Sequence, residues 1–200
     1  MADFNPYAPP QAVSDVARAP VQLPRGRALK WIYGGLAGVT FFVLVLTHLV
    51  AYSDETQVLW DAVGVIDKPI ALVRIVLALM WIHGAWSDVP RQLRAELDVT
   101  PGGAVGRLFI PAFNLYWMFA LNQKLCTAID RVLVGAGQRP AAPFALATLA
   151  PALHIGHAIF SKVSEGLPVL FSFGASSLLW FVYMYESDGA RAKMLADPSE

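Results

Sequence analysis

Long apolar runs separated by short polar segments dominate this chain. The run at 31–52 holds 22 residues without a charged side chain, and about 20 residues with a rise of 1.5 Å each are enough to cross the hydrocarbon core of a bilayer. Further apolar runs follow at 69–87, 143–160 and 168–185. The pattern predicts an all-α polytopic membrane protein with these four segments as transmembrane helices.

The two ends of the chain differ in composition from these runs. Residues 1–30 are rich in proline and alanine and end in a basic collar of Arg25, Arg27 and Lys30, so we expect a flexible tail. Residues 186–200 are polar and charged and predict a second tail. The chain therefore divides into a tail at 1–30, a helical membrane domain at 31–185 and a tail at 186–200.

The segment 108–134 has an ambiguous pattern. Its uncharged part, 108–121, has 14 residues, which is short for a transmembrane helix. Beyond it, Leu121, Leu125, Ile129 and Val132 recur at helical spacing with polar residues between them, as in a helix that lies in the membrane interface. We expect one re-entrant or interfacial amphipathic helix here, and a fifth transmembrane helix is the alternative.

The distribution of Lys and Arg favours the first layout, because cytoplasmic loops of membrane proteins carry an excess of both. If the N-terminus and 108–134 lie on the cytoplasmic side, twelve Lys and Arg fall inside and only Lys68 and Lys162 outside. If the segment crosses, eight fall inside and six outside. We expect a multi-pass protein of the bacterial inner membrane with both termini in the cytoplasm.

Composition and motifs exclude several classes of function. Charged residues make up 15% of the chain, compared with roughly 25% in ordinary globular proteins. Basic and acidic residues cancel at 15 each, which argues against nucleic acid as a partner. The single Cys126 excludes an intrachain disulfide. The sequence holds no phosphate-binding loop, dinucleotide-binding turn or catalytic serine elbow, so we expect no enzyme.

Small and charged residues inside the spans predict how the helices pack. Gly34 and Gly38 form a GxxxG pattern, and Gly174 and Ser177 lie on a small-residue segment, so both places predict close approach of a neighbouring helix. We expect the long stem of Arg74 to carry its charge to the interface, and a functional buried charge is the alternative.

A motif at 100–119 resembles an uncharacterised family of small bacterial multi-span membrane proteins. The residues that carry the likeness are Pro101, Gly102, Ala104, Val105, Gly106, Phe109, Pro111, Asn114, Leu115 and Tyr116. Arg107 and Leu108 stand where such proteins usually have aromatic residues. The resemblance implies a helical membrane protein and no assigned activity.

The same motif predicts a break in a helix. Pro111 removes one backbone hydrogen bond, and the amide of Asn114 can satisfy the freed groups. Tyr116 and Trp117 are then expected as interfacial anchors for the helix that follows. A ligand or ion site at the break is the alternative.

All four histidines, His48, His83, His154 and His157, fall inside predicted spans, where histidine is costly and often functional. His48 with His154 or His157 could ligate the iron of haem b. The runs 34–51 and 152–161 also weakly resemble the membrane anchors of succinate dehydrogenase and fumarate reductase. Packing without a cofactor is the other interpretation of these histidines.

Together these features predict a structural or accessory membrane protein that packs in the lipid bilayer against another membrane protein or a second copy. A haem b electron-transfer subunit is the first alternative. A small transporter or channel with its site at Pro111 and Asn114 is the second.

Overall fold

The computed structural model describes residues 23–50, 57–164 and 167–196, and this part of the chain is all-α. Four long helices correspond to the predicted apolar runs: α1 (Leu29–Val50), α2 (Gln57–Asp88), α6 (Phe144–Phe160) and α7 (Leu167–Ala196). Three of them hold candidate membrane spans, at Leu29–Leu49, Lys68–Asp88 and Pro168–Ala196, and α6 is a shorter apolar helix. The chain is therefore a helical protein of the multi-pass membrane type.

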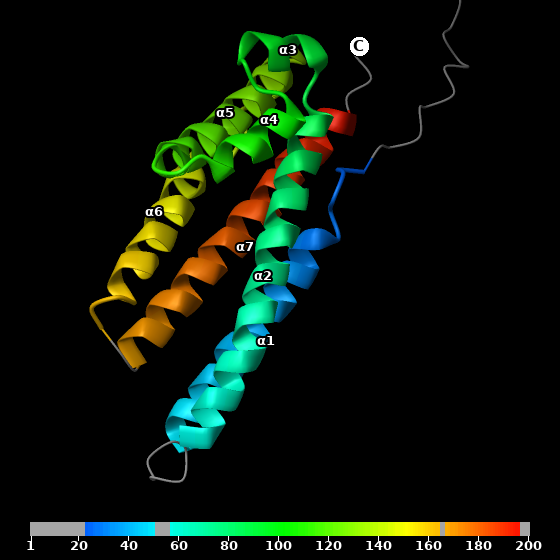
Figure 1. Ribbon diagram of the computed structural model, residues 1–200. Helices are drawn as coiled ribbons and strands as arrows, with labels where there is room; N and C mark the ends of the chain where they lie inside the picture. Colours follow the sequence, from blue (N-terminus) through cyan, green and yellow to red (C-terminus); the bar gives the residue numbers. More distant parts are fainter. Residues whose placement is uncertain (1–22, 51–56, 165–166, 197–200) are drawn as a thin grey trace, which may run out of the picture.

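The long helices lie side by side, with α7 between α6 and the pair formed by α1 and α2 (Figure 1). Helix α1 packs against both α2 and α7, and α6 packs against α7 and α5. The other elements gather where α1 begins and α2 and α7 end: the short α3 (Arg91–Glu96), α4 (Pro101–Gly106) and η2 (Arg107–Phe109), and the longer α5 (Phe113–Gly135). We call this the α3–α5 end of the molecule.

Two helix boundaries differ from the sequence prediction. Helix α2 already begins at Gln57, so Pro69 lies inside it instead of in its first turn. Helix α7 continues to Ala196, about three turns beyond the predicted end at residue 185. The apolar runs locate the central parts of these helices, and each helix continues into more polar sequence, as α7 does through the buried Ser187, Arg191 and Met194.

Pro101, Gly102 and Gly103, residues that usually interrupt helices, form the first turn of one here. Pro101 occupies the first position of α4, where its missing N–H costs no hydrogen bond. Thr100 caps the helix, and its hydroxyl oxygen accepts a hydrogen bond from the Gly103 N–H at 3.0 Å.

The apolar stripe of α5 is confirmed, but its expected contact with lipid is wrong. Leu121, Leu125 and Ile129 are each 0–1% exposed and belong to the main hydrophobic core, which also contains Tyr183 of α7. Helix α5 begins at Phe113 and is not among the candidate membrane spans. Its amphipathic stripe therefore fastens α5 to the protein, and its other face remains outside the core.

The two glycines of the GxxxG pattern have different surroundings. A Cβ atom at Gly34 would lie 2.6 Å from Cδ2 of Phe181 in α7, and one at Gly174 would lie 2.7 Å from Cε2 of Phe41 in α1. Gly34 and Gly174 therefore allow α1 and α7 to approach each other closely. A Cβ atom at Gly38 would meet nothing within 4 Å, so Gly38 makes no such contact in the described chain.

This difference predicts opposite effects of one added methyl group. Gly34→Ala should lower the free energy of unfolding by about 1–3 kcal/mol, because it overpacks the contact with Phe181. Gly38→Ala should leave it unchanged or raise it by up to ~1 kcal/mol, since alanine favours a helix over glycine. Equilibrium unfolding in mixed micelles measures both variants, and equal effects would contradict the packing described for Gly34.

Candidate functional site

A buried ion network ties α1, α2 and α7 together at the α3–α5 end. Its members are Lys30, Asp88, Asp188 and Arg191, which we call the ion network. Lys30 Nζ lies 2.8 Å from Asp188 Oδ2, and Arg191 Nη1 lies 2.6 Å from Asp188 Oδ1. Arg191 also pairs with Asp88. The four side chains are at most 5% exposed, and two cations face two carboxylates.

Backbone and aromatic groups complete the ion network. The Arg25 N–H donates to Asp88 Oδ2 at 2.9 Å, and the Arg25 carbonyl accepts from Arg191 Nη2 at 2.8 Å. Trp81 Nε1 donates to Asp188 Oδ1 at 3.0 Å. Because buried charges are stable only when paired and hydrogen-bonded, these contacts fix how the beginning of α1 meets the ends of α2 and α7.

Sequence reasoning missed these residues, because it assigned Asp188 and Arg191 to a polar tail. The sequence does contain one signal for the position of Arg191, which is helical periodicity. Trp180, Tyr183, Ser187, Arg191 and Met194 continue the helical spacing of the preceding span, and all five are at most 8% exposed. The periodicity therefore extends beyond the point where hydropathy falls.

The motif at 100–119 builds a cap on the α3–α5 end. Trp117, predicted as an interfacial anchor, is instead 2% exposed and donates from Nε1 to the Ala104 carbonyl at 3.0 Å. The Arg107 guanidinium lies over its ring at 4.7 Å and also binds Asp98. The prediction for Trp117 fails because the chain folds back between α4 and α5, which places the indole inside the cap.

The expected helix break at Pro111 lies in an exposed turn before α5. Ala112, next to Pro111, has a φ of 61°, and the backbone N–H of Asn114 donates to the Ile110 carbonyl at 3.0 Å. This is an ordinary backbone bond of the first turn of α5, and the role expected for the Asn114 side chain stays a prediction. Tyr116 is 64% exposed, as an interfacial residue would be. Its anchoring role stays a prediction.

Arg74 is buried between three helices, so the expectation that it snorkels to the interface is wrong. The residue is 9% exposed. Its Nη2 donates to Ser177 Oγ of α7 at 2.8 Å and to the Tyr33 hydroxyl of α1 at 3.3 Å. The guanidinium carbon lies 4.8 Å from the ring centre of Phe173. Ser177 therefore binds a buried charge in addition to being a small residue at a helix contact.

The two histidines of α6 bind serines of α7. His157 Nδ1 lies 2.8 Å from Ser172 Oγ, and His154 Nδ1 lies 3.4 Å from Ser176 Oγ. The Ser172 hydroxyl already donates its hydrogen to the Val169 carbonyl at 2.8 Å. His157 must therefore be the donor to Ser172, which leaves its Nε2 as an acceptor. These contacts join α6 to α7.

The geometry does not fit the predicted haem site. His48 belongs to α1, whereas His154 and His157 belong to α6, and α7 lies between these helices (Figure 1). His154 and His157 share one helix at a spacing of three residues, so they cannot take opposite faces of one haem. Among the described residues no group of three His, Cys, Asp or Glu side chains could hold a metal ion.

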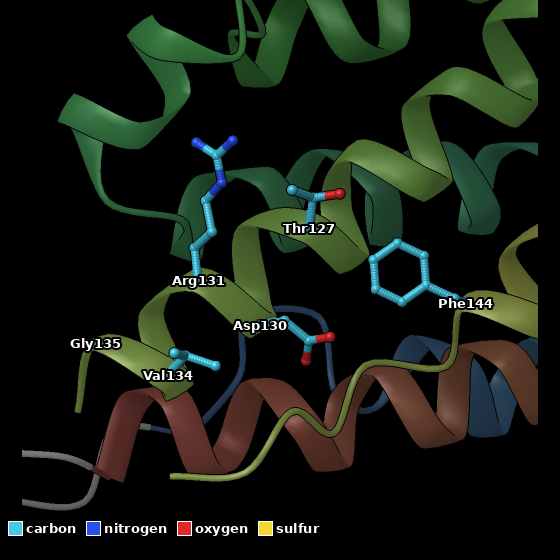
Figure 2. A pocket seen from close by; sticks show the side chains of 6 residues that line it. All are labelled: Thr127, Asp130, Arg131, Val134, Gly135 and Phe144. Atoms are coloured by element: carbon cyan, nitrogen blue, oxygen red, sulfur yellow. The ribbon is translucent and has the colours of Figure 1, made fainter. Parts of the chain in front are cut away.

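A shallow hollow lies between α5 and the beginning of α6 (Figure 2), lined by Thr127, Asp130, Arg131, Val134, Gly135 and Phe144. Its charged side chains already have partners. Asp130 Oδ1 accepts from the N–H groups of Ala141 and Ala142, each at 2.8 Å, and Arg131 pairs with Glu96. These bonds hold the connection into α6 and give the hollow a structural role.

Cys126 faces the core beside this hollow and is fully buried. Burial, together with the negative charge of Asp130, raises the pKa of its thiol to about 12. The side chain is therefore a neutral thiol at physiological pH, as is typical of a cysteine packed in a core.

The chain matches no protein-family model, no curated protein and no solved structure. The resemblance to an uncharacterised membrane-protein family stays an expectation.

The ion network predicts a large loss of stability when one carboxylate is removed. Asp188→Asn leaves Lys30 and Arg191 without a shared anion, and breaking a buried pair from one side costs about 3–5 kcal/mol. Equilibrium unfolding in mixed micelles measures the change. Glu96→Gln is the matched control, because its pair with Arg131 is exposed and contributes about 0–1 kcal/mol. Equal losses in the two variants would contradict a stabilising role of the ion network.

Proposed function

We propose that this chain is a structural or accessory membrane protein that acts by lateral helix packing with a partner membrane protein or a second copy. The observation that carries the proposal is an exposed stripe along α6. Its members recur at intervals of four, three, four and three residues and are small or aliphatic: Ala145, Leu149, Ala152, Gly156 and Ile159. Such a seam fits the side of another helix, with small residues permitting close approach.

The length of α6 supports the same conclusion. With 17 residues the helix is about 25 Å long, and the hydrocarbon core is about 30 Å thick. Short transmembrane helices can accommodate this mismatch by associating with other helices. Among the described elements, helix α6 packs mainly against α7 and α5, and the stripe above is exposed.

The layout we propose has four crossings, by α1, α2, α6 and α7. The contacts of Arg191 with Arg25 and of Asp188 with Lys30 support it, because they join the beginning of α1 to the end of α7. An even number of crossings returns the chain to the same side, and five crossings would not. The fifth crossing by α5 is therefore disfavoured.

Charge supports placing the α3–α5 end in the cytoplasm. The exposed basic residues there are Arg25, Arg27, Arg91, Arg131, Arg139 and Lys193, and the opposite end exposes Lys68 and Lys162. This is the asymmetry of the positive-inside rule. Both ends of the described chain would then lie on the cytoplasmic side of a bacterial inner membrane.

The exposed face of α5 supports an interfacial position for this helix. Its beginning, with η2 and the turn before it, exposes apolar side chains: Phe109, Ile110, Phe113, Leu115 and Tyr116. Further along, Gln123 and Arg131 are exposed, and Gln123 donates to Thr148 in the second turn of α6 at 3.2 Å. The change from apolar to polar is expected for a helix that starts among lipids and leaves them.

The function predicts association through α6. In a mild detergent, the full-length protein should run as an oligomer or carry a co-purifying membrane protein, which native mass spectrometry identifies. Gly156→Leu fills the centre of the stripe and should abolish this association. Ala158→Leu introduces the same side chain at an exposed position off the stripe and should retain the association. A lone monomer from wild type, or equal behaviour of both variants, would overturn the proposal.

A further inference from the structure

Arg74 carries hydrogen-bond donors that nothing in the described chain accepts. Its Nε is buried and has no partner. Tyr33 and Ser177 each use their hydroxyl oxygen to accept from Arg74 Nη2, so the hydrogen of each hydroxyl remains to be donated. No hydrogen bond among the described residues uses either hydrogen. Three donors from three helices, one on the guanidinium itself and two on hydroxyls beside it, thus lack an acceptor among the described residues.

The charge of Arg74 also indicates that an anionic partner is missing. An arginine side chain cannot lose its proton in a protein, and a charge at membrane depth is costly unless paired. The other buried cations, Lys30 and Arg191, have carboxylate partners. Arg74 has only hydroxyls and aromatic rings, and no carboxylate of the described residues contacts it.

A second copy of the chain could not supply the missing anion from its described spans. The candidate spans contain acidic residues only toward the α3–α5 end, at Asp88, Glu186 and Asp188. Arg74 lies six residues from Lys68, or about 9 Å along α2, and therefore near the opposite end. Among the described residues, therefore, no carboxylate lies at the depth of Arg74, and a different molecule can supply the acceptor.

We infer that Arg74, Tyr33 and Ser177 form an intramembrane site for an anionic oxygen group carried by an acyl chain, such as the carboxylate of a fatty acid. The guanidinium supplies the countercharge, and Arg74 Nε and the two hydroxyls supply the hydrogen bonds. A ligand with an apolar tail can arrive through the lipid phase. At the same depth along α2, the exposed side chains of Leu72, Val73 and Val76 form an apolar outer surface along which such a tail can lie.

Binding of palmitate labelled with ¹³C at its carboxyl carbon tests the site. The full-length protein is placed in nanodiscs of phosphatidylcholine, and the carboxyl resonance reports the bound anion. Tyr33→Phe and Ser177→Ala each remove one donor and leave the guanidinium in place, so each should weaken binding several-fold. Arg74→Gln should weaken it at least tenfold, which is about 1.4 kcal/mol. Wild-type affinity in all three variants would overturn the inference.

Three controls separate the possible sources of the effect. Lys68→Gln removes an exposed charge from the same helix and should leave binding unchanged, and an equal loss there would show nonspecific attraction. Palmitate methyl ester should not compete, and competition by the ester would overturn the need for an anion. Dodecyl phosphate should compete, whereas displacement by inorganic phosphate alone would assign the site to a free ion and overturn the acyl-chain requirement.

A structural loss in Arg74→Gln is recognised from its unfolding curve. In that case the palmitate affinities of Tyr33→Phe and Ser177→Ala test the inference. No binding of palmitate to the wild-type protein would also overturn the inference, and it would leave the association through α6 unaffected.

Discussion

The paired charges of the ion network set the arrangement of the rest of the chain. Lys30, Asp88, Asp188 and Arg191 come from three helices and are buried together, so no one of them tolerates the loss of its partner without a large energetic cost. Their pairing brings the beginning of α1 to the ends of α2 and α7. This constraint holds the two ends of the described chain together at the α3–α5 end.

Polar side chains at membrane depth have a related role with different partners. His154 and His157 bind serines of α7, and Arg74 reaches hydroxyls of α1 and α7. Each contact replaces water as the partner of a polar group in a low-dielectric environment, which is why these groups join helices instead of facing lipid. Arg74 differs from the histidines because it is a permanent charge that no carboxylate of the described residues contacts. We therefore assign the histidines to helix packing and Arg74 to a candidate ligand site.

Hydropathy predicts the apolar helices of the fold, and periodicity predicts the stripe of α5. Neither predicts what an apolar stripe packs against, so Leu121, Leu125 and Ile129 were assigned to lipid, although they face α7 and the core. The same limit explains Trp117, whose burial depends on the fold of the cap, and Arg74, whose partners lie 41 and 103 residues away in sequence. Small residues predict close contacts, but only the three-dimensional neighbours distinguish Gly34 from Gly38.

The side of the membrane reached by two loops tests the layout most directly. In a Cys126→Ala background, Arg139→Cys lies between α5 and α6 and Lys162→Cys follows α6. A membrane-impermeant maleimide applied from the periplasmic side should label position 162 and leave position 139 unlabelled until the membrane is opened. Labelling of position 139 from the periplasm would mean that α5 crosses the bilayer, and it would contradict the account.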